Sequence, residues 1–335
     1  MLGDVTGIGP EIAAKLLASG KIQEFANVVI IGDRRVLKLG MRNAGVKVPH
    51  TVVGRIDEAQ FPRNDFPLID LGNVDPAQIP QGAASDESGK LCGDTLKYMI
   101  DLALAGKLDG ICFAPLNKGA MNRGGWKFND EHQMFAKLTG HDGFFGEMNV
   151  IEQFSTFRVT SHVALRDAVN LVTPERITSA IRLADDSLRA AGCANPRIGV
   201  AALNPHNGEN GLFGDEEIRI IRPTVDKLRA AGVNCQGPIS SDVIFLKALK
   251  NEFDGVVMMY HDQGQIATKL LGFNKGVTVT AGLKTVFTTP AHGTAYDIAG
   301  LGLANPQAMT NAFELAARMA TSHRSSQPQP EETLS

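Results

Sequence analysis

The sequence predicts an α/β protein in which a mostly parallel sheet is covered by helices on both faces. Three observations support this fold class: short apolar runs that suit buried strands, longer helical patterns between them, and 35 glycines, which fit a fold with many tight turns. The length of 335 residues suggests roughly two domains. No internal repeat is visible.

The predicted elements alternate along the chain. Apolar runs predict strands at 27–32, 109–114, 197–203 and 255–260. Helical patterns predict helices at 11–17, 94–104, 173–191, 216–231 and 306–320. Thr173 is expected to cap the third helix, with Pro174 as its first helical residue. Gly192 and Gly232 mark helix ends that are followed by strands.

Composition argues against several classes of function. Lys and Arg total 33 against 36 Asp and Glu, so no basic excess favours a nucleic-acid partner. No apolar run approaches the ~18 residues of a membrane span, and no signal peptide is apparent. The four cysteines are far apart and form no Cys-x-x-Cys motif, which disfavours a disulfide scaffold and indicates the cytoplasm.

A glycine-rich segment, GDVTGIGPE, starts at Gly3 and leads into the first predicted helix. Its glycines permit a tight turn, and the helix N-terminus could hold an anion, although an ordinary turn would explain the segment equally well. The spacing does not match the GxGxxG dinucleotide fingerprint. A strand normally precedes such a turn. Here we expect it to be missing or cut to two residues, which a misplaced start codon would explain.

Three histidines each follow a strand-like run: His162 in TSHVAL, His206 in LNPHNGE and His261 in YHDQG. Taken singly, each is explained by hydrogen bonding in a core or loop, and their spacing gives no local metal motif. Taken together, they could supply three nitrogen ligands to a metal and leave positions open for a substrate. Asp262, beside His261, could be a further ligand, orient the imidazole or accept a proton.

Two further segments carry candidate site residues. The loop 290–300, PAHGTAYDIAG, precedes Asn305 and a predicted helix start, and such a loop can wrap an adenosine or simply connect a strand to a helix. Lys118, in PLNK, directly follows the predicted strand 109–114. A lysine at the end of a buried strand is a better candidate for a site than an ordinary exposed lysine.

These segments together resemble the PdxA family, which is named for 4-hydroxythreonine-4-phosphate dehydrogenase of pyridoxal phosphate biosynthesis. The matching segments run in family order from residue 3 to about 320: GDVTGIGPE, PLNKGAM, TSHVALRDAV, LNPHNGENGLFGDEE, GPISSD, YHDQGQIATK and HGTAYDIAG. The last segment also resembles the adenosine-binding loop of isopropylmalate and isocitrate dehydrogenases. The resemblance implies the isocitrate/isopropylmalate dehydrogenase-like fold, with two α/β/α domains and a cleft between them.

The expected domains are discontinuous in sequence. Residues 1–125 and 275–325 are expected to form a first domain that carries the cofactor loop. Residues 126–274 are expected to form a second domain with the metal ligands and the dimer contacts. The polar, proline-containing tail 326–335 is predicted to be disordered.

The resemblance implies a homodimeric dehydrogenase with a shared active site. The family oxidises a hydroxyl group to a ketone with NAD or NADP, and the resulting β-keto acid then loses CO2. The resemblance assigns a divalent metal (Zn, Mg, Mn or Co) to His162, His206 and His261, with one histidine from the partner subunit. The residues expected to bind the cofactor are Gly7, His292, Gly293, Thr294, Ala295, Asp297 and Asn305.

The catalytic base stays open among three residues, Asp242, Asp262 and Lys118. Lys269 matches a substrate-binding lysine of the family, and its cation suits a carboxylate or phosphate.

Four substrate positions depart from the family pattern. Glu131 and His132 stand where the family has histidine and threonine, Thr278 replaces an asparagine, and Phe287 replaces an arginine. A phosphate or carboxylate buried without a cation costs several kcal/mol. We therefore expect that 4-hydroxythreonine 4-phosphate is not the best substrate. Another sugar acid or a cis-dihydrodiol carboxylate is expected to fit better.

Two alternative functions fit these residues less well. A true isopropylmalate or isocitrate dehydrogenase is disfavoured, because those enzymes bind metal through carboxylates. A non-catalytic paralogue that binds a metabolite is conceivable, but the retained histidines and adenosine-type loop argue against it.

Overall fold

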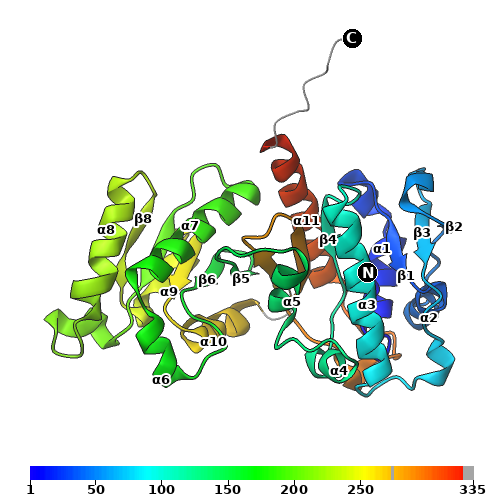
Figure 1. Ribbon diagram of the computed structural model, residues 1–335, viewed down its shortest axis with the longest axis horizontal. Helices are drawn as coiled ribbons and strands as arrows, with labels where there is room; N and C mark the ends of the chain where they lie inside the picture. The colour runs from blue at the N-terminus through cyan, green and yellow to red at the C-terminus, as the bar shows by residue number, and fades with distance from the viewer. Residues whose placement is uncertain (273–274, 327–335) are drawn as a thin grey trace, which may run out of the picture.

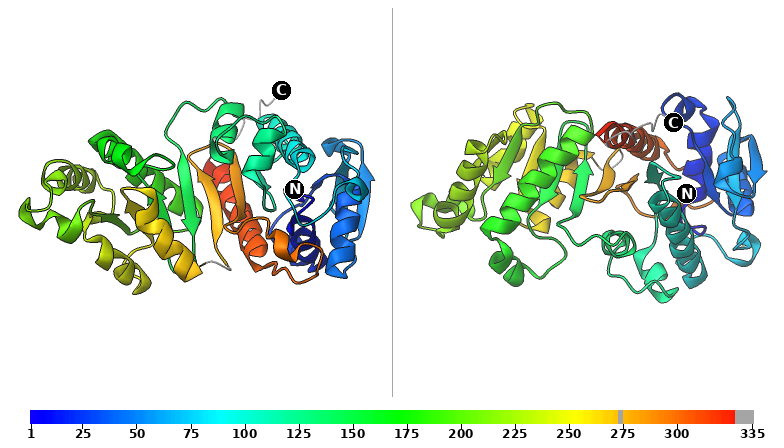
Figure 2. Two further views of the ribbon diagram at one scale, coloured as in Figure 1. Left: turned by 90° about the horizontal axis from the view of Figure 1, so that it is seen from below. Right: turned by 45° about the horizontal axis from the view of Figure 1, so that its top comes forward.

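The computed structural model describes residues 1–272 and 275–326, which form two β-sheets flanked by helices (Figure 1). The smaller sheet is parallel, with the order β1-β3-β2, and consists of β1 (Ile30–Gly32), β2 (His50–Val53) and β3 (Phe66–Asp70). The larger sheet has eight strands in the order β4-β11-β10-β5-β6-β9-β7-β8. Figure 2 shows helices on both sides of the sheets. The α/β fold class is therefore confirmed.

The remaining bounds follow the chain. The strands of the larger sheet are β4 (Gly110–Cys112), β5 (Gly146–Val150), β6 (Ser155–Arg158), β7 (Ile198–Ala201), β8 (Cys235–Ile239), β9 (Gly255–Met258), β10 (Val277–Ala281) and β11 (Val286–Pro290). The α-helices are α1 (Gly9–Ala18), α2 (Arg34–Ala44), α3 (Asp86–Leu104), α4 (Lys118–Arg123), α5 (Glu131–Leu138), α6 (Leu165–Ala168), α7 (Pro174–Ala190), α8 (Arg222–Ala230), α9 (Ser241–Leu249), α10 (His261–Gly272) and α11 (Gln307–Ser326).

Most strand pairs are parallel, as expected, but the larger sheet also contains three antiparallel pairs. β10 is antiparallel to both β11 and β5, and β5 is antiparallel to β6. The connectors 151–154 and 282–285 are too short for the crossover that parallel neighbours require. The other four pairs in this sheet are parallel.

The predicted strands and helices are all present, with some different ends. The Thr173 hydroxyl accepts a hydrogen bond from the Arg176 backbone and caps α7, as predicted. The predicted helix 216–231 instead begins with a π-helical turn, Glu217–Ile221, before α8. Pro223 near the junction has no N–H to give to a carbonyl four residues earlier, which accounts for the wider turn.

The larger sheet crosses the expected domain boundary. Strands β5 to β9 belong to the expected second domain, whereas β4, β10 and β11 belong to the first, and hydrogen bonds between β10 and β5 join the two sets. The domain division therefore stays a prediction. Helix α11 extends to Ser326, and the rest of the predicted tail, 327–335, lies outside the described residues. No helix within 1–272 or 275–326 is long and apolar enough to cross a membrane.

Candidate active site

The two faces of the larger sheet differ in polarity at its centre. On β5, β6 and β10, side chains alternate between the faces. One face presents Met148, Phe157 and Val279 to the core beneath α7 and α11. The opposite face carries polar side chains on the same strands, all of them buried except the half-buried Glu147: Glu147, Asn149, Thr156, Arg158, Thr278 and Thr280. This group, called here the polar face, contacts α5 through His132 and α10 through Gln265.

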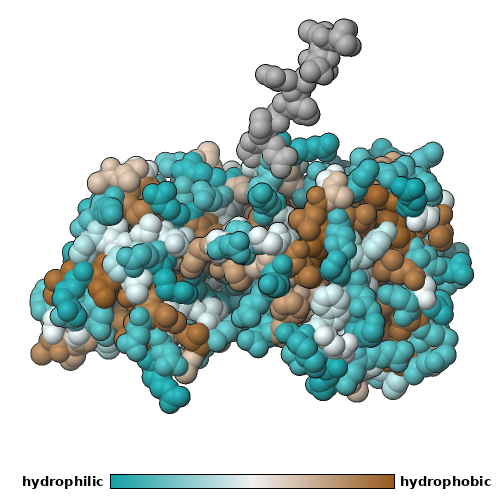
Figure 3. All heavy atoms as spheres, viewed as in Figure 1, coloured by the Kyte–Doolittle hydropathy of each residue, from teal (hydrophilic) through white to brown (hydrophobic). Residues whose placement is uncertain are grey.

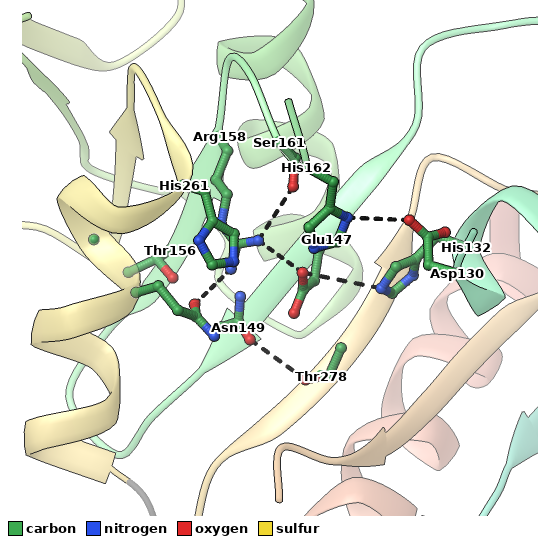
Figure 4. Close-up of polar contacts among 12 residues, drawn as sticks. Asp130, His132, Glu147, Asn149, Thr156, Arg158, Ser161, His162, His261 and Thr278 are labelled. Atoms are coloured by element: carbon green, nitrogen blue, oxygen red, sulfur yellow. Dashed lines mark hydrogen bonds and ion pairs between the residues drawn. The ribbon is translucent and has the colours of Figure 1, made fainter. Parts of the chain in front are cut away.

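Arg158 and Glu147 are the charged pair of the polar face. The Arg158 guanidinium donates to Glu147 at 2.7 Å and to Gln265 of α10 at 2.6 Å, and its side chain is only 2% exposed. Burial opposes ionisation of Glu147, but Arg158 and then His132 outweigh it and lower the pKa of Glu147 to about 2. Figure 4 shows this pair directly beside two histidines.

These histidines, His162 and His261, follow the ends of the parallel neighbours β6 and β9. Their ring centroids are 5.4 Å apart. The Nδ1 atom of His162 lies 3.1 Å from Asp130, and that of His261 lies 2.6 Å from Asp262. Carboxylates that bind Nδ1 orient an imidazole so that Nε2 can ligate a metal, so this arrangement fits a metal site. His162 also has a positive φ of 45°, an unusual conformation typical of functional sites.

Asp130 links α5 to the first of these histidines. One of its oxygens caps α5 by accepting from the Gln133 backbone, and the other contacts His162. Burial alone would raise the pKa of Asp130, but the hydrogen bonds from His162 and Gln133 lower it to about 2. The bond to Asp130 in turn raises the pKa of His162.

His206 does not join the other two histidines. It is exposed in the loop after β7, and among the described residues no three His, Cys, Asp or Glu side chains of one chain form a metal-binding group. The loop is strained, because His206, Asn207 and Glu209 all have positive φ. Buried Glu217 holds its start by accepting from the backbone N–H groups of Leu203 and Asn204. The three-histidine metal site stays a prediction that needs a second copy of the chain.

The three candidate bases, Lys118, Asp262 and Asp242, lie in different surroundings. Lys118 is the first residue of α4 and contacts Glu131 at 2.8 Å. Partial burial opposes its charged form, but Glu131 outweighs burial and raises the pKa of Lys118, so its amino group holds its proton more tightly than an ordinary lysine. Asp262 is exposed and contacts His261. Asp242 is exposed in the first turn of α9, and Lys269 is exposed two turns after His261 on α10.

The four divergent substrate positions fall into two groups. Thr278 belongs to the polar face and donates to Asn149 at 3.3 Å. His132 contacts the Thr280 hydroxyl at 2.6 Å and Glu131 lies beside it, so both α5 residues border this face. Phe287 is fully buried and stacks on Phe135 with ring centroids 4.2 Å apart. It therefore contributes to the core rather than presenting a surface to a ligand.

The predicted cofactor loop packs against the turn before α1. The Ile8 N–H donates to Thr294 at 3.0 Å, and a Cβ on Gly7 would lie 2.7 Å from the Thr294 carbonyl oxygen, so the close approach requires glycine. Ala295 has a positive φ of 41°. Asn305 caps α11 by accepting from the Gln307 backbone.

The remaining predicted cofactor residues are accessible to different degrees. Gly293 and Asp297 are exposed, and His292 is half-buried with Nδ1 at 3.0 Å from the Gly293 carbonyl oxygen. The loop is partly accessible, and the cofactor-binding role of its residues stays a prediction.

The site residues predicted from the sequence do not include Glu147, Asn149, Arg158, Thr280 or Asp130. A usable signal existed in GEMNV and STFR, where polar and apolar residues alternate with period two. A search for continuous apolar runs does not detect such strands.

Substituting Glu147 should change the acid stability of the protein. Its pKa is lowered from 4.5 to about 2, so its stabilising contribution is present above pH 4.5 and is lost as the pH falls toward 2. Between pH 6 and pH 3, the Glu147→Gln variant should lose about 2 kcal/mol less unfolding free energy than the wild type. Urea unfolding across this range measures the difference. Glu152→Gln, at an exposed position just after β5, should follow the wild type; an unchanged pH slope in Glu147→Gln would contradict the assignment.

Known proteins match this chain over nearly its whole length. The family described as pyridoxal phosphate biosynthetic protein PdxA matches residues 24–316. A Pseudomonas aeruginosa protein provisionally named 4-hydroxythreonine-4-phosphate dehydrogenase 2 is 46% identical over 95% of each chain. The D-threonate 4-phosphate dehydrogenase of Cupriavidus necator is 39% identical over 96% of each chain.

Solved structures of the same family are also similar to this chain. The 4-hydroxythreonine-4-phosphate dehydrogenase of Klebsiella pneumoniae superimposes with a TM-score of 0.81 at 38% identity, covering 95% of this chain and 98% of that one. A terephthalate 1,2-cis-dihydrodiol dehydrogenase from Burkholderia xenovorans gives 0.65 at 26% identity, covering 92% and 96%. The isocitrate dehydrogenase of Methylococcus capsulatus gives 0.51 at 14% identity, covering 96% and 86%, and shares the fold alone.

The fold and the relatives define the protein as a dehydrogenase that acts on CH–OH groups, built on the isocitrate dehydrogenase-like fold. Within that class, the chain belongs to the PdxA family.

Proposed function

We propose that this chain is a cytoplasmic, NAD(P)-dependent dehydrogenase that oxidises the secondary alcohol of a small phosphorylated hydroxy acid other than 4-hydroxythreonine 4-phosphate. The observation that carries the proposal is the buried polar face, with the Arg158 guanidinium beside His162 and His261. Such a site offers a cation for an anionic group and imidazoles for a metal. Oxidation would transfer a hydride to the nicotinamide and a proton to a base, and a β-keto acid product would then lose CO2.

The metal would be held by His162 and His261 of one chain and His206 of a second copy. Asp130 and Asp262 orient the first two imidazoles through Nδ1. A bound divalent cation would lower the pKa of the substrate hydroxyl. Since Asp262 contacts His261 and is exposed, it is the best placed of the candidate bases, whereas the raised pKa of Lys118 suits it to holding a substrate anion.

A homodimer would bring the third histidine to this site. The loop that carries His206 also exposes Leu212 (72%) and Phe213 (47%). Further apolar side chains are exposed on α9 and α10, among them Leu246 and Leu270. Figure 3 shows apolar residues at several places on the surface of both halves of the molecule. Exposed apolar surface next to an incomplete site supports a second copy as the partner.

Arg158 modifies the expectation drawn from the loss of the family arginine. Phe287 on β11 cannot bind an anion, but the sheet carries a buried arginine three strands away, on β6. With strands about 4.8 Å apart, this cation lies roughly 14 Å across the sheet from Phe287. A phosphorylated acid held in a different position fits this arrangement, and relatives at 36–46% identity carry the names of phosphorylated acids.

A substrate panel tests the proposal. NAD and NADP reduction should be measured with D-threonate 4-phosphate, 4-hydroxythreonine 4-phosphate, unphosphorylated D-threonate and terephthalate cis-dihydrodiol, each with added divalent metal. We expect the kcat/KM for D-threonate 4-phosphate to exceed that for 4-hydroxythreonine 4-phosphate at least tenfold, about 1.4 kcal/mol of transition-state binding. The reverse order would refute the substrate assignment. Metal and substrate binding without reduction of either cofactor would instead indicate a metabolite-binding paralogue.

A further inference from the structure

Asp4, in the glycine-rich segment before α1, is a buried carboxylate that is hydrogen-bonded by neutral groups. It accepts from the Thr6 backbone N–H at 2.9 Å, from the hydroxyls of Thr6 and Ser88, and from the Tyr296 hydroxyl at 2.8 Å. Only 1% of its surface is exposed. A buried charge is costly unless hydrogen bonds satisfy it, so these donors hold the carboxylate in one orientation.

The position of Asp4 is set by the larger sheet and by α3. Its backbone N–H donates to the Pro115 carbonyl, shortly after β4, at 3.0 Å, and Ser88 lies in the first turn of α3. A Cβ on Gly3 would lie 2.8 Å from the Ala114 Cβ, so the turn packs directly against the segment that follows β4. Asp4 is therefore a fixed point to which another segment can be attached.

The attached segment is the predicted cofactor loop, through Tyr296. Burial and then the Asp4 carboxylate raise the pKa of Tyr296, so its hydroxyl keeps its proton and donates. A second hydrogen bond joins the same two segments, because the Ile8 N–H donates to the Thr294 carbonyl at 3.0 Å. The loop is thus tied to the turn before α1 at two points.

Ala295 lies between these two points and has an unusual backbone conformation. Its φ is 41°, where the Cβ of an L-residue comes too close to a carbonyl oxygen. Such a conformation persists only where the surrounding structure holds it. Without the contact from Tyr296, Ala295 can relax to a negative φ, and the exposed residues on either side, Gly293 and Asp297, would change direction.

The end of the loop is held by a separate clamp on α1. The Lys15 ammonium donates to the carbonyls of Gly302 and Ala304 at 2.9 and 2.7 Å, and the Ala304 N–H donates to Glu11 at 2.8 Å. Loss of the Tyr296 contact should therefore loosen residues 292–301 and leave 302–304 in place.

We propose that Asp4 is a positioning residue for the dinucleotide cofactor, which acts through the Tyr296 hydroxyl to hold loop 290–300 in the conformation that binds NAD(P). The proposal rests on the NAD(P)-dependent activity proposed above, from which it takes the role of the loop. Neither Asp4 nor Tyr296 has to touch the cofactor. A phenylalanine at position 296 would keep the ring but lose the hydrogen bond that holds Ala295.

The Tyr296→Phe variant of the full chain tests the proposal. We expect the Kd for NADH or NADPH, measured by fluorescence titration without substrate, to rise about fivefold or more, because a loosened loop must be ordered on binding. The KM for NAD(P) should rise in parallel, while kcat changes by less than about twofold. Without cofactor, amide hydrogen exchange should become about tenfold faster or more in 292–301 and stay unchanged in 302–304.

Tyr98→Phe is the matched control. Tyr98 lies about 15 Å further along α3 than Ser88, so loss of its hydroxyl should leave the Kd, the KM and the loop exchange unchanged. Asp4→Asn tests whether Asp4 acts through Tyr296. It should raise the Kd about twofold or more, because an amide is a weaker acceptor than a carboxylate, and should have no further effect when Tyr296 is already replaced by Phe.

An unchanged Kd or an unchanged loop exchange in Tyr296→Phe would overturn the proposal. An equal effect of Asp4→Asn in both backgrounds would also overturn it, because Asp4 would then act through the fold alone. If Asp4→Asn does not fold, the comparison of Tyr296→Phe with Tyr98→Phe still decides. Failure of the proposed function is distinguishable, since the wild type itself would then neither bind nor reduce NAD or NADP.

Discussion

Mixing two inactive variants, His162→Ala and His206→Ala, is expected to restore about a quarter of wild-type activity. Each variant alone should lose metal and at least a thousandfold in kcat, because an incomplete ligand set does not hold the cation. If His162 and His206 of different subunits share a site, a mixed dimer contains one intact site and one site lacking both histidines. Random exchange makes half of the dimers mixed, and half of their sites work.

The chain offers a matched control for this experiment. His261 lies beside His162 in the same chain, so a mixture of His162→Ala with His261→Ala leaves every site of a mixed dimer with one histidine missing. This mixture should stay inactive. Activity is measured by NAD(P)H formation after subunit exchange, and size-exclusion chromatography tests whether the wild type and each variant form the proposed dimer. If activity recovers in the control mixture but not in the first mixture, His206 is not the histidine that the other subunit supplies. If activity recovers in neither mixture, the two subunits do not share a site.

Replacing Arg158 by Gln is expected to raise the KM for the phosphorylated substrate about a hundredfold while changing the KM for NAD(P) little. Truncating one partner of a buried, hydrogen-bonded charge pair costs about 2–5 kcal/mol, and kcat/KM should fall accordingly. The preference for phosphorylated over unphosphorylated D-threonate should largely disappear. Steady-state kinetics with both acids measures this loss.

A second variant separates anion binding from structural support. Arg158→Gln leaves the carboxylate of Glu147 buried without its cation, which destabilises the fold. The double variant Arg158→Gln/Glu147→Gln removes both charges and should recover thermal stability, but its KM for the phosphorylated acid should remain high. If the double variant recovers a wild-type KM, Arg158 acts only through the fold. Arg158→Lys should recover only part of the affinity, because lysine lacks the planar two-pronged donor.

Local patterns in the sequence predicted much of the framework. Thr173 and Pro174 mark the start of α7, Gly192 marks its end, and buried apolar runs locate β7 and β9. These features depend on interactions within a few residues, such as caps, left-handed turns and continuous apolar runs, so a single sequence displays them. The sequence alone also shows that His162 and His261 each follow a predicted strand, because this too is a feature of neighbouring residues. Parallel strands then bring the two residues together.

The strands that form the polar face were not predicted, because their character depends on register. In GEMNV and STFR, the sequence shows polar and apolar residues in alternation but not which face is buried or which strand is the neighbour. Arg158 would be an ordinary surface arginine on a strand with an exposed face. Packing of α10 and β5 around it buries it and pairs it with Gln265 and Glu147.

By itself, the sequence determined the α/β class, the helix boundaries set by caps and glycines, and the family, because each is carried by short contiguous segments. Tertiary structure alone decided that His206 stands apart from His162 and His261, that Phe287 belongs to the core, and that a buried arginine lies beside the imidazoles. These outcomes follow from which strands are neighbours and in which register. The choice of neighbouring strand and the register depend on contacts between residues far apart in the chain. Burial and charge pairing are therefore set by the whole fold.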